Sequence, residues 1–480
     1  MKRRSVFLFL FVFFIFYSCR EEKKTSLRGS RPNIVFILTD DQGYGDLSCH
    51  GNPILKTPNM DWIHDRSVRF TDFMVSPTCA PTRAALYSGM HEFKTGVYDT
   101  RPPRNHMSLD VVTLAEMLKR AGYVTGLFGK WHLGLDSLYR PEHRGFDVAL
   151  TMIHPGDYRI WYDPPLARNG VPEEHKGYRT RILFDEAMKF IEANKDTLFF
   201  CHIPTFSPHE PLVVPKAYSD RWDGNKFFGM ISYLDENVGR LVKKLQELGL
   251  EKNTLLILMS DNGATFGADI WNAHMRGVKT TAWYGGTRTF SFWYWPGTLT
   301  PADVGAQTAH VDVLPTLTEV AGYSIPPEMQ KHLDGRSLVP LLQDPRAPWP
   351  ERVLFTHVGR WKEGAIDAHK YCQCNVRKGD YVAVRIEYCD DPTCWAECPV
   401  FKRVQEEHKP GYYSKKYAQF NYAVTPKGKW ALYNLKEDIS QSHNVAEEHP
   451  GIVNELSRRY EEWWSEIHHC VNGPEKCKLK

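Results

Sequence analysis

Residues 33–41 read Asn33-Ile34-Val35-Phe36-Ile37-Leu38-Thr39-Asp40-Asp41, an apolar run that stops at two adjacent carboxylates. A second apolar run, residues 254–259, leads into Ser260-Asp261-Asn262-Gly263. Continuous apolar runs of this length are typical of buried strands in a parallel sheet. Because such sheets bind ligands beyond the carboxyl ends of their strands, the sequence predicts an α/β fold with both acidic clusters at one sheet edge.

These two clusters offer only oxygen ligands. Carboxylates come from Asp40, Asp41 and Asp261, and an amide oxygen comes from Asn262. A hard, all-oxygen set suits Ca²⁺ or Mg²⁺ better than zinc. One Asp pair in a turn is commonly structural, but two such clusters at two strand ends favour a function. We therefore expect Ca²⁺ or Mg²⁺ to bind at these clusters.

A cysteine lies between the clusters, in the segment Cys79-Ala80-Pro81-Thr82-Arg83. Proline suits the first position of a helix because it brings no backbone donor there. Pro81 therefore predicts a helix start just after Cys79, where exposed amides and the helix dipole favour an anion. For this segment alone, the alternative is a buried structural cysteine in a proline-containing turn.

The segment resembles the C-x-P-[ST]-R signature of the formylglycine-dependent (type I) sulfatases, or arylsulfatases, of the alkaline phosphatase superfamily. In that family a maturation enzyme oxidises the cysteine to formylglycine, an aldehyde whose hydrate attacks sulfur. The resemblance implies that Cys79 is modified in this way and needs a formylglycine-generating partner. It also implies one divalent cation, Ca²⁺ in the first place with Mg²⁺ as the alternative, bound by an oxygen of the modified Cys79 together with Asp40, Asp41, Asp261 and Asn262.

Three further segments match the family in order and spacing. Gly129-Lys130-Trp131-His132-Leu133-Gly134 follows an expected strand at 124–128, and Ser207-Pro208-His209 follows one at 198–203. The third segment, 275–288, contains Lys279. Lys130 and His132 flank Trp131, so both can point to the same side of an extended chain. Each residue alone has an ordinary alternative as a structural histidine or a surface lysine, but their joint order favours catalysis.

The resemblance implies a role for each of these side chains. Lys130 stabilises the hydrate on the cation side, and one hydroxyl attacks sulfur in line with the leaving oxygen. Lys279 and His209 bind the sulfate, and His209 protonates the leaving alcohol, a step that positioned acids accelerate about 10²–10⁴-fold. His132 takes the proton of the second hydroxyl, which returns the aldehyde. Arg83 supports the modified side chain and the ligands.

Candidate substrate contacts come from a group of aromatic residues and from one position at which the chain differs from the family pattern. Aromatic rings gather at Tyr158, Trp161 and Tyr162, and such rings suit the apolar faces of sugars, although core packing is their ordinary use. Tyr284 stands where the family usually has Glu, and His274 adds a titratable ring nearby. We expect a sulfated glycan as substrate, with contacts from Trp161, Tyr162, His274 and Tyr284.

The motifs join residues 31–345 into one catalytic domain, for which the resemblance implies an alkaline phosphatase-like, mainly parallel sheet flanked by helices. A proline-rich linker near 347–350 opens a smaller C-terminal part, 346–480. Residues 430–435 predict a strand, and 451–468 carry apolar residues at helical spacing. We expect an α+β domain with a short antiparallel sheet and a closing helix.

The N-terminus has the pattern of an export signal. Basic residues precede the apolar run 6–17, which is well short of the roughly 20 residues of a transmembrane helix. Phe16-Tyr17-Ser18-Cys19 resembles a bacterial lipobox. We expect 1–19 to be a signal peptide with Cys19 lipidated and 20–30 to be a tether. This predicts an exported bacterial enzyme in the periplasm or at the cell surface, held to the membrane only by lipid; a plain secretory signal is the alternative.

Seven of the eleven cysteines lie in the last quarter of the chain. Export makes disulfides the default there, and Cys470 with Cys477 could close a small loop. Cys389, Cys394 and Cys398 could instead hold zinc. Cys201, in an expected buried strand, is predicted to be a free thiol.

The net charge of +3 over 480 residues gives no bulk field for nucleic acid, and that class is excluded. Two other functions stay open. One is a phosphatase or phosphodiesterase of the same superfamily, which uses Ser or Thr and several His metal ligands. The other is a non-catalytic surface lipoprotein that binds sulfated glycans. The cysteine and the all-oxygen metal set favour sulfate ester hydrolysis.

Overall fold

The computed structural model describes residues 26–387 and 425–471. Its largest element is a ten-stranded sheet in the order β12-β2-β11-β9-β1-β8-β4-β5-β6-β7. The central strands are parallel: β9 (Thr254–Ser260), β1 (Asn33–Thr39), β8 (Phe199–Pro204), β4 (Val124–Phe128) and β5 (Val148–Met152). The outer strands are β11 (Ser291–Tyr294), β2 (Val68–Phe70) and β12 (Ala302–Val304) on one side, and β6 (Leu166–Arg168) and β7 (Val171–Glu173) on the other. The expected parallel core is confirmed, and both margins add antiparallel strands that the sequence did not indicate.

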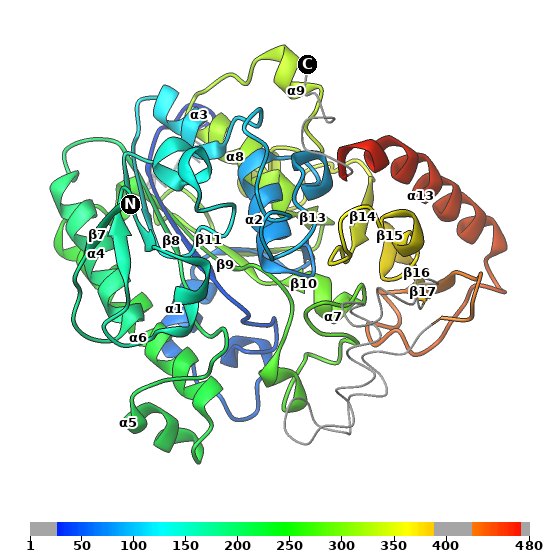
Figure 1. Ribbon diagram of the computed structural model, residues 1–480, viewed down its shortest axis with the longest axis horizontal. Coiled ribbons are helices and arrows are strands. Elements are labelled where there is room, and N and C mark those ends of the chain that lie inside the picture. Colours follow the sequence, from blue (N-terminus) through cyan, green and yellow to red (C-terminus); the bar gives the residue numbers. More distant parts are fainter. Residues whose placement is uncertain (1–25, 388–424, 472–480) are drawn as a thin grey trace, which may run out of the picture.

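Alternate residues of β1 explain why helices cover both faces of this sheet. Ile34 and Phe36 pack with one helical layer, and Val35 and Ile37 pack with the other, because successive side chains of a strand point to opposite faces. The first layer contains α2 (Cys79–Ser88), α3 (Leu114–Arg120), α8 (Val313–Val320) and α10 (Val339–Gln343). The second contains α1 (Pro58–Asp65), α4 (Arg179–Ala193) and α6 (Lys226–Glu247). Both layers are visible in Figure 1.

A separate antiparallel sheet forms the C-terminal part, at the right of Figure 1. Its strands are β14 (Val353–His357), β15 (Cys374–Lys378), β16 (Tyr381–Arg385) and β17 (Ala431–Asn434). One face packs against α13 (Pro450–Val471) through Tyr460, Trp463 and Trp464. The other face packs against Trp283 and Tyr284 of the large part. The expected sheet and closing helix are confirmed, whereas the boundary at 345/346 stays a prediction.

The remaining elements are short. A three-stranded sheet joins β10 (Arg288–Thr289), β3 (Phe73–Met74) and β13 (Thr308–Ala309), and three one-turn helices are α5 (Lys216–Ser219), α7 (Tyr284–Thr287) and α9 (Pro327–Gln330). Among the described helices, none has the length and apolar character needed to cross a membrane.

Local details differ from expectation at the cysteines. Helix α2 begins at Cys79 itself, so Pro81 is its third residue rather than its first. Cys201 is a buried thiol, as predicted. Cys374 is also a buried thiol, and its Sγ donates a hydrogen bond to the Arg385 carbonyl at 3.4 Å. The expectation of C-terminal disulfides is therefore wrong for this residue.

Other cysteine predictions meet the limits of the described chain. Cys470 is disulfide-bonded, and its expected partner Cys477 lies outside the described residues. The predictions for Cys19 and for Cys389, Cys394 and Cys398 lie outside the described residues as well, as do residues 20–25 of the expected tether. Residues 26–30 are described and do not form a free tether, because Leu27 is buried and the Gly29 amide donates to the Glu319 carbonyl at 3.0 Å.

Candidate active site

Two parallel strands bring the acidic clusters together. Thr39 of β1 is in register with Ser260 of β9, so the residues that follow each strand emerge side by side. The Asp41 amide donates to Asp261 Oδ1 at 3.3 Å, and Asn262 Nδ2 donates to Asp41 Oδ1 at 3.1 Å. Asp41 has a left-handed φ of +69°, which turns the chain away from the strand direction immediately after Asp40.

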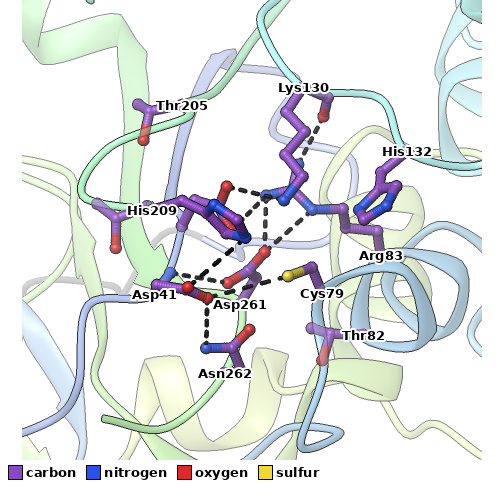
Figure 2. Close-up of polar contacts among 12 residues, drawn as sticks. Asp41, Cys79, Thr82, Arg83, Lys130, His132, Thr205, His209, Asp261 and Asn262 are labelled. Atoms are coloured by element: carbon purple, nitrogen blue, oxygen red, sulfur yellow. Dashed lines mark hydrogen bonds and ion pairs between the residues drawn. The ribbon is translucent and has the colours of Figure 1, made fainter. Parts of the chain in front are cut away.

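Helix α2 contributes two side chains from its first two turns, as Figure 2 shows. Cys79 Sγ lies 3.9 Å from Asp41 Oδ1. Arg83, four residues on and therefore on the same helix face, donates to Asp261 Oδ2 from Nη2 at 2.7 Å and from Nε at 3.1 Å. Its Nη1 donates to the Lys130 carbonyl at 2.5 Å. Arg83 thus ties the helix, the β9 loop and the β4 loop into one unit.

Two lysines neutralise the carboxylates. Lys130, after β4, donates from Nζ to Asp40 Oδ2 at 2.8 Å. Lys279 forms an ion pair with Asp41 Oδ1. Both lysines are buried, so their charges act in a region of low dielectric where an ion pair is stronger than at the surface.

The two histidines differ in how they are held. His209 Nε2 lies 3.7 Å from Asp41 Oδ2, while its Nδ1 contacts the Glu210 carbonyl at 2.6 Å. His132 is held through Nε2 by the Thr100 carbonyl at 2.9 Å. A carbonyl can only accept, so Nε2 of His132 carries the proton and Nδ1 keeps its lone pair. That buried Nδ1 has no hydrogen-bond partner in the described part of the chain.

Asp40 and Asp41 are ionised despite their burial. Burial alone would raise their pKa values, but Lys130 and then His209 hold the pKa of Asp40 well below its usual range. Lys279 and His209 likewise lower the pKa of Asp41. The segment after β1 therefore contributes two carboxylate charges to the site, each paired with a lysine.

Asp261 and Cys79 respond to burial in the opposite way. Burial and the nearby Asp40 charge raise the pKa of Asp261 to about 6. Burial raises the pKa of the Cys79 thiol to about 12, in spite of Lys130. Because the thiolate is the nucleophilic form, unmodified Cys79 is a poor nucleophile here.

The residues present fit a hard divalent cation. Asp40 Oδ1 and Asn262 Oδ1 are buried oxygens without a hydrogen-bond partner among the described residues, and such orphans are rare unless a ligand satisfies them. Asp40, Asp41, Cys79 and His209 also offer ligand atoms that lie within 4.8 Å of one another. The strand-end oxygens are those that Ca²⁺ or Mg²⁺ prefer.

A pocket of about 630 Å³ opens above this cluster, and Asp41, Cys79, Lys130, His132, His209 and Lys279 line its base. The structure therefore brings together the motif residues predicted for metal binding and catalysis. Sequence reasoning missed most of the residues higher in the pocket: Thr100, Arg101, Asn105, His106, Asp136, Glu210, Phe266 and Arg360. Tyr158 also lines it, with its ring 5.6 Å from that of His209.

The four proposed substrate contacts lie elsewhere. Trp161 is buried under Arg179, whose guanidinium carbon is 4.1 Å from its ring, and Tyr162 is exposed outside the pocket lining. The buried Tyr284 donates its hydroxyl to Asp72 at 2.9 Å and so has a structural place. His274 packs edge-on against Trp271. The structure does not bring any of the four to the pocket.

Known proteins resemble this chain in both sequence and fold. A profile of the Sulfatase family matches residues 32–323. Arylsulfatase A of Bos taurus is 30% identical over 87% of this chain and 83% of its own length, and arylsulfatase A of Homo sapiens is 32% identical over 65% and 68%. A structure of Ps i-CgsB in complex with k-i-k-neocarrahexaose superposes with a TM-score of 0.75 at 24% identity, over 90% of this chain and 92% of that one. The chain therefore belongs to the sulfatase family, as a type I sulfatase of the alkaline phosphatase superfamily.

Proposed function

We propose that this sulfatase removes sulfate from a sulfated carbohydrate, using formylglycine made from Cys79 and one divalent cation, Ca²⁺ in the first place. The observation that carries the proposal is the position of Cys79. It is the first residue of α2, its Sγ is 3.9 Å from Asp41, and it lines the pocket with Lys130 and Lys279. An unmodified thiol at this position would be a poor nucleophile, because burial raises its pKa to about 12.

The hydrated aldehyde would supply a hydroxyl nucleophile for sulfur, and the cation held by Asp40, Asp41, Asp261 and Asn262 would supply positive charge beside it. The side chains around them then bind and orient the substrate. Lys279 and His209 project into the pocket beside Asp41 and can hold sulfate oxygens. Lys130 and Arg83 keep the carboxylates in place through the bonds to Asp40 and Asp261.

The two histidines suit opposite proton transfers. His132 has its proton fixed on Nε2 by Thr100 and a lone pair on Nδ1, so it can accept a proton. Burial lowers the pKa of His209, although Asp41, which its Nε2 faces, acts in the opposite direction. A bound sulfate ester would add negative charge that further favours the protonated ring. It can therefore donate to the leaving alcohol, which needs a proton because an alkoxide leaves poorly.

A carbohydrate fits the upper pocket. Tyr158 offers an aromatic face for a sugar ring, and Arg101, His106 and Asp136 offer polar groups around it. The fold neighbour Ps i-CgsB, whose complex holds a neocarrahexaose, supports an oligosaccharide as the kind of ligand. The panel of sulfated sugars described next identifies the sugar and the position of its sulfate.

The deciding experiment measures inorganic sulfate from a panel of sulfated monosaccharides and glycans, with matched phosphate esters alongside. The full chain is produced with a formylglycine-generating enzyme, and Cys79→Ala is the blank. We expect sulfate release from one sugar class, absent in the blank, and a Cys79 peptide with the aldehyde mass. Release of phosphate alone would support the phosphatase alternative. Aldehyde formation with no release from any ester would support the glycan-binding alternative.

The location of the enzyme is a second part of the proposal. The export pattern and the lipobox-like segment support a mature chain outside the cytoplasm, attached through lipid on Cys19. In bacterial cells grown with labelled fatty acid, the chain should carry the label and Cys19→Ser should lose it. An unlabelled chain that is secreted would support the plain signal peptide.

A further inference from the structure

A second group of metal-ligating side chains lies away from the active site. Cys49 and His50 belong to the 3₁₀ turn η1 (Ser48–His50), and His64 belongs to α1. Each offers one ligand atom, and the three atoms lie within 4.8 Å of one another. All three residues are half-buried, so an ion from solvent can reach them.

The hydrogen bonds of both histidines leave one ring nitrogen of each free for a ligand. His50 Nδ1 lies 2.7 Å from the Tyr44 carbonyl, and His64 Nδ1 lies 2.9 Å from Asp65 Oδ1. Both partners are acceptors, so each Nδ1 carries a proton and the Nε2 lone pair of the neutral ring is left for a ligand. Neither Nε2 has a hydrogen-bond partner within the described residues. Histidines that bind metals characteristically donate their other N–H to a carbonyl or a carboxylate in this way.

The surroundings hold the three side chains in place without an ion. The His50 ring stacks on Tyr44 with centroids 3.8 Å apart, and the His64 ring meets Phe292 edge-on at 5.1 Å. Asp61 fixes the turn, because its Oδ1 accepts from the Cys49 amide at 3.1 Å.

We propose that Cys49 Sγ, His50 Nε2 and His64 Nε2 bind one Zn²⁺, with water as the fourth ligand. A set of one thiolate and two imidazoles suits zinc, whereas the oxygen set of the active site suits Ca²⁺. On binding, the Cys49 S–H bond breaks, a Zn–S bond forms and the proton goes to solvent. The ion would fasten η1 to α1 and so secure the loop that follows the ligand Asp41.

The test is zinc binding to the full chain, freed of metal and then kept in excess Ca²⁺ so that the oxygen site is filled. Titration against a chromogenic chelator should find one tight Zn²⁺ that Cys49→Ser and His64→Ala each weaken at least about 10-fold. Asp65→Ala, which removes the acceptor behind His64, should weaken binding about 10-fold, as loss of such partners typically does. His143→Ala, at an exposed histidine outside the cluster, is the matched control and should change nothing.

A second readout reports the sulfur ligand directly. Co²⁺ in place of Zn²⁺ should give a near-ultraviolet thiolate-to-metal absorption that disappears in Cys49→Ser, and melting curves of the metal-free variants check that they fold. The proposal is overturned if the chain binds no zinc in excess Ca²⁺. It is equally overturned if zinc binds with an affinity that Cys49→Ser and His64→Ala leave unchanged, since the ion would then sit at other residues.

Discussion

The base and the upper wall of the pocket are built in different ways. The base consists of charged groups buried at the ends of β1, β4 and β9 and at the start of α2, joined by ion pairs such as Lys130–Asp40 at 2.8 Å. The wall consists of side chains from loops and from the C-terminal part, among them Arg101, Tyr158 and Arg360. Regular elements thus fix the reacting groups, while connecting segments face the rest of the substrate. We therefore expect changes in the base to abolish turnover and changes in the wall to alter selectivity.

The largest effect should follow removal of the cation. Chelation is expected to lower kcat/KM at least about 100-fold, because a bound cation supplies several kcal/mol of charge stabilisation. Adding back Ca²⁺ or Mg²⁺ to separate samples identifies the ion by the activity restored. Full activity in the chelated protein, with no metal found by elemental analysis, would contradict the role of the oxygen cluster.

Next comes the buried ion pair in the base. Lys130→Ala removes the nearest cation from the buried Asp40 and leaves it the longer ion pair with Arg83 at 3.9 Å. The loss should cost about 3–5 kcal/mol of unfolding free energy and about 10²–10³ in kcat. Chemical denaturation and initial rates measure the two. Lys119→Ala is the control, because Lys119 pairs with Asp147 at 2.6 Å but is 52% exposed, where such pairs contribute about 0–1 kcal/mol. Equal losses in the two variants would show that burial does not matter here.

A smaller effect is expected where the wall supports the base. Arg360 Nη2 donates to the Thr100 hydroxyl at 3.1 Å, and the Thr100 carbonyl holds His132. Arg360→Ala should lower kcat about 10-fold, the low end for the loss of such support, and change the pH profile of kcat. Arg360→Lys tests whether a positive charge at this position is enough to support Thr100 and His132, without the guanidinium hydrogen bond. An unchanged pH profile would mean that Arg360 does not act through His132.

Selectivity should respond to the wall itself. Arg101 is 41% exposed and is held by Asp99 at 3.0 Å, so its guanidinium can meet a second anionic group of a glycan. Arg101→Ala should raise KM about 10-fold for a polyanionic oligosaccharide, the effect of about one charged hydrogen bond, and leave a small aryl sulfate almost unaffected. An equal rise in KM for both substrates would contradict a contact between Arg101 and a second anionic group of the glycan.

The smallest effect is expected outside the pocket. Tyr162 is 47% exposed and does not line the cavity, so Tyr162→Ala should change kcat/KM by less than about twofold, within the range of ordinary surface substitutions. Tyr158→Ala, four residues earlier and inside the pocket, is its partner in this test. A larger loss in Tyr162→Ala would place substrate beyond the pocket that we describe.

The difference between the base and the wall of the pocket also explains which site residues the sequence could predict. Asp40 and Asp261 were predictable because apolar runs mark the strands and the chain must leave a parallel sheet at its carboxyl edge. Arg360 was not, since it reaches the pocket from 260 residues beyond Thr100. The aromatic group was visible in the sequence, but the turn η5 (Pro155–Arg159) decides that Tyr158 rather than Trp161 faces the cavity.

For the fold, the strength of the local pattern decided the outcome. The long apolar strands and α13 were predicted to within a few residues. The strands β6 and β7 at the edge of the sheet have three residues each. Three residues are too few to show the alternation of apolar and polar side chains that indicates a strand. They form because neighbouring strands offer them hydrogen bonds, which is information outside their own sequence.

The burial of Cys79 also sets an order of events in the life of the chain. Cys79 is 1% exposed, and every residue of α2 is buried. The formylglycine-generating enzyme that we propose would need access to the segment around the cysteine, which the folded chain does not offer. On that proposal, oxidation has to precede the packing of α2 onto the sheet, and a chain that folds before oxidation would keep the unmodified cysteine. Supplying the maturation enzyme before or after folding, and weighing the Cys79 peptide each time, would reveal how long that window stays open.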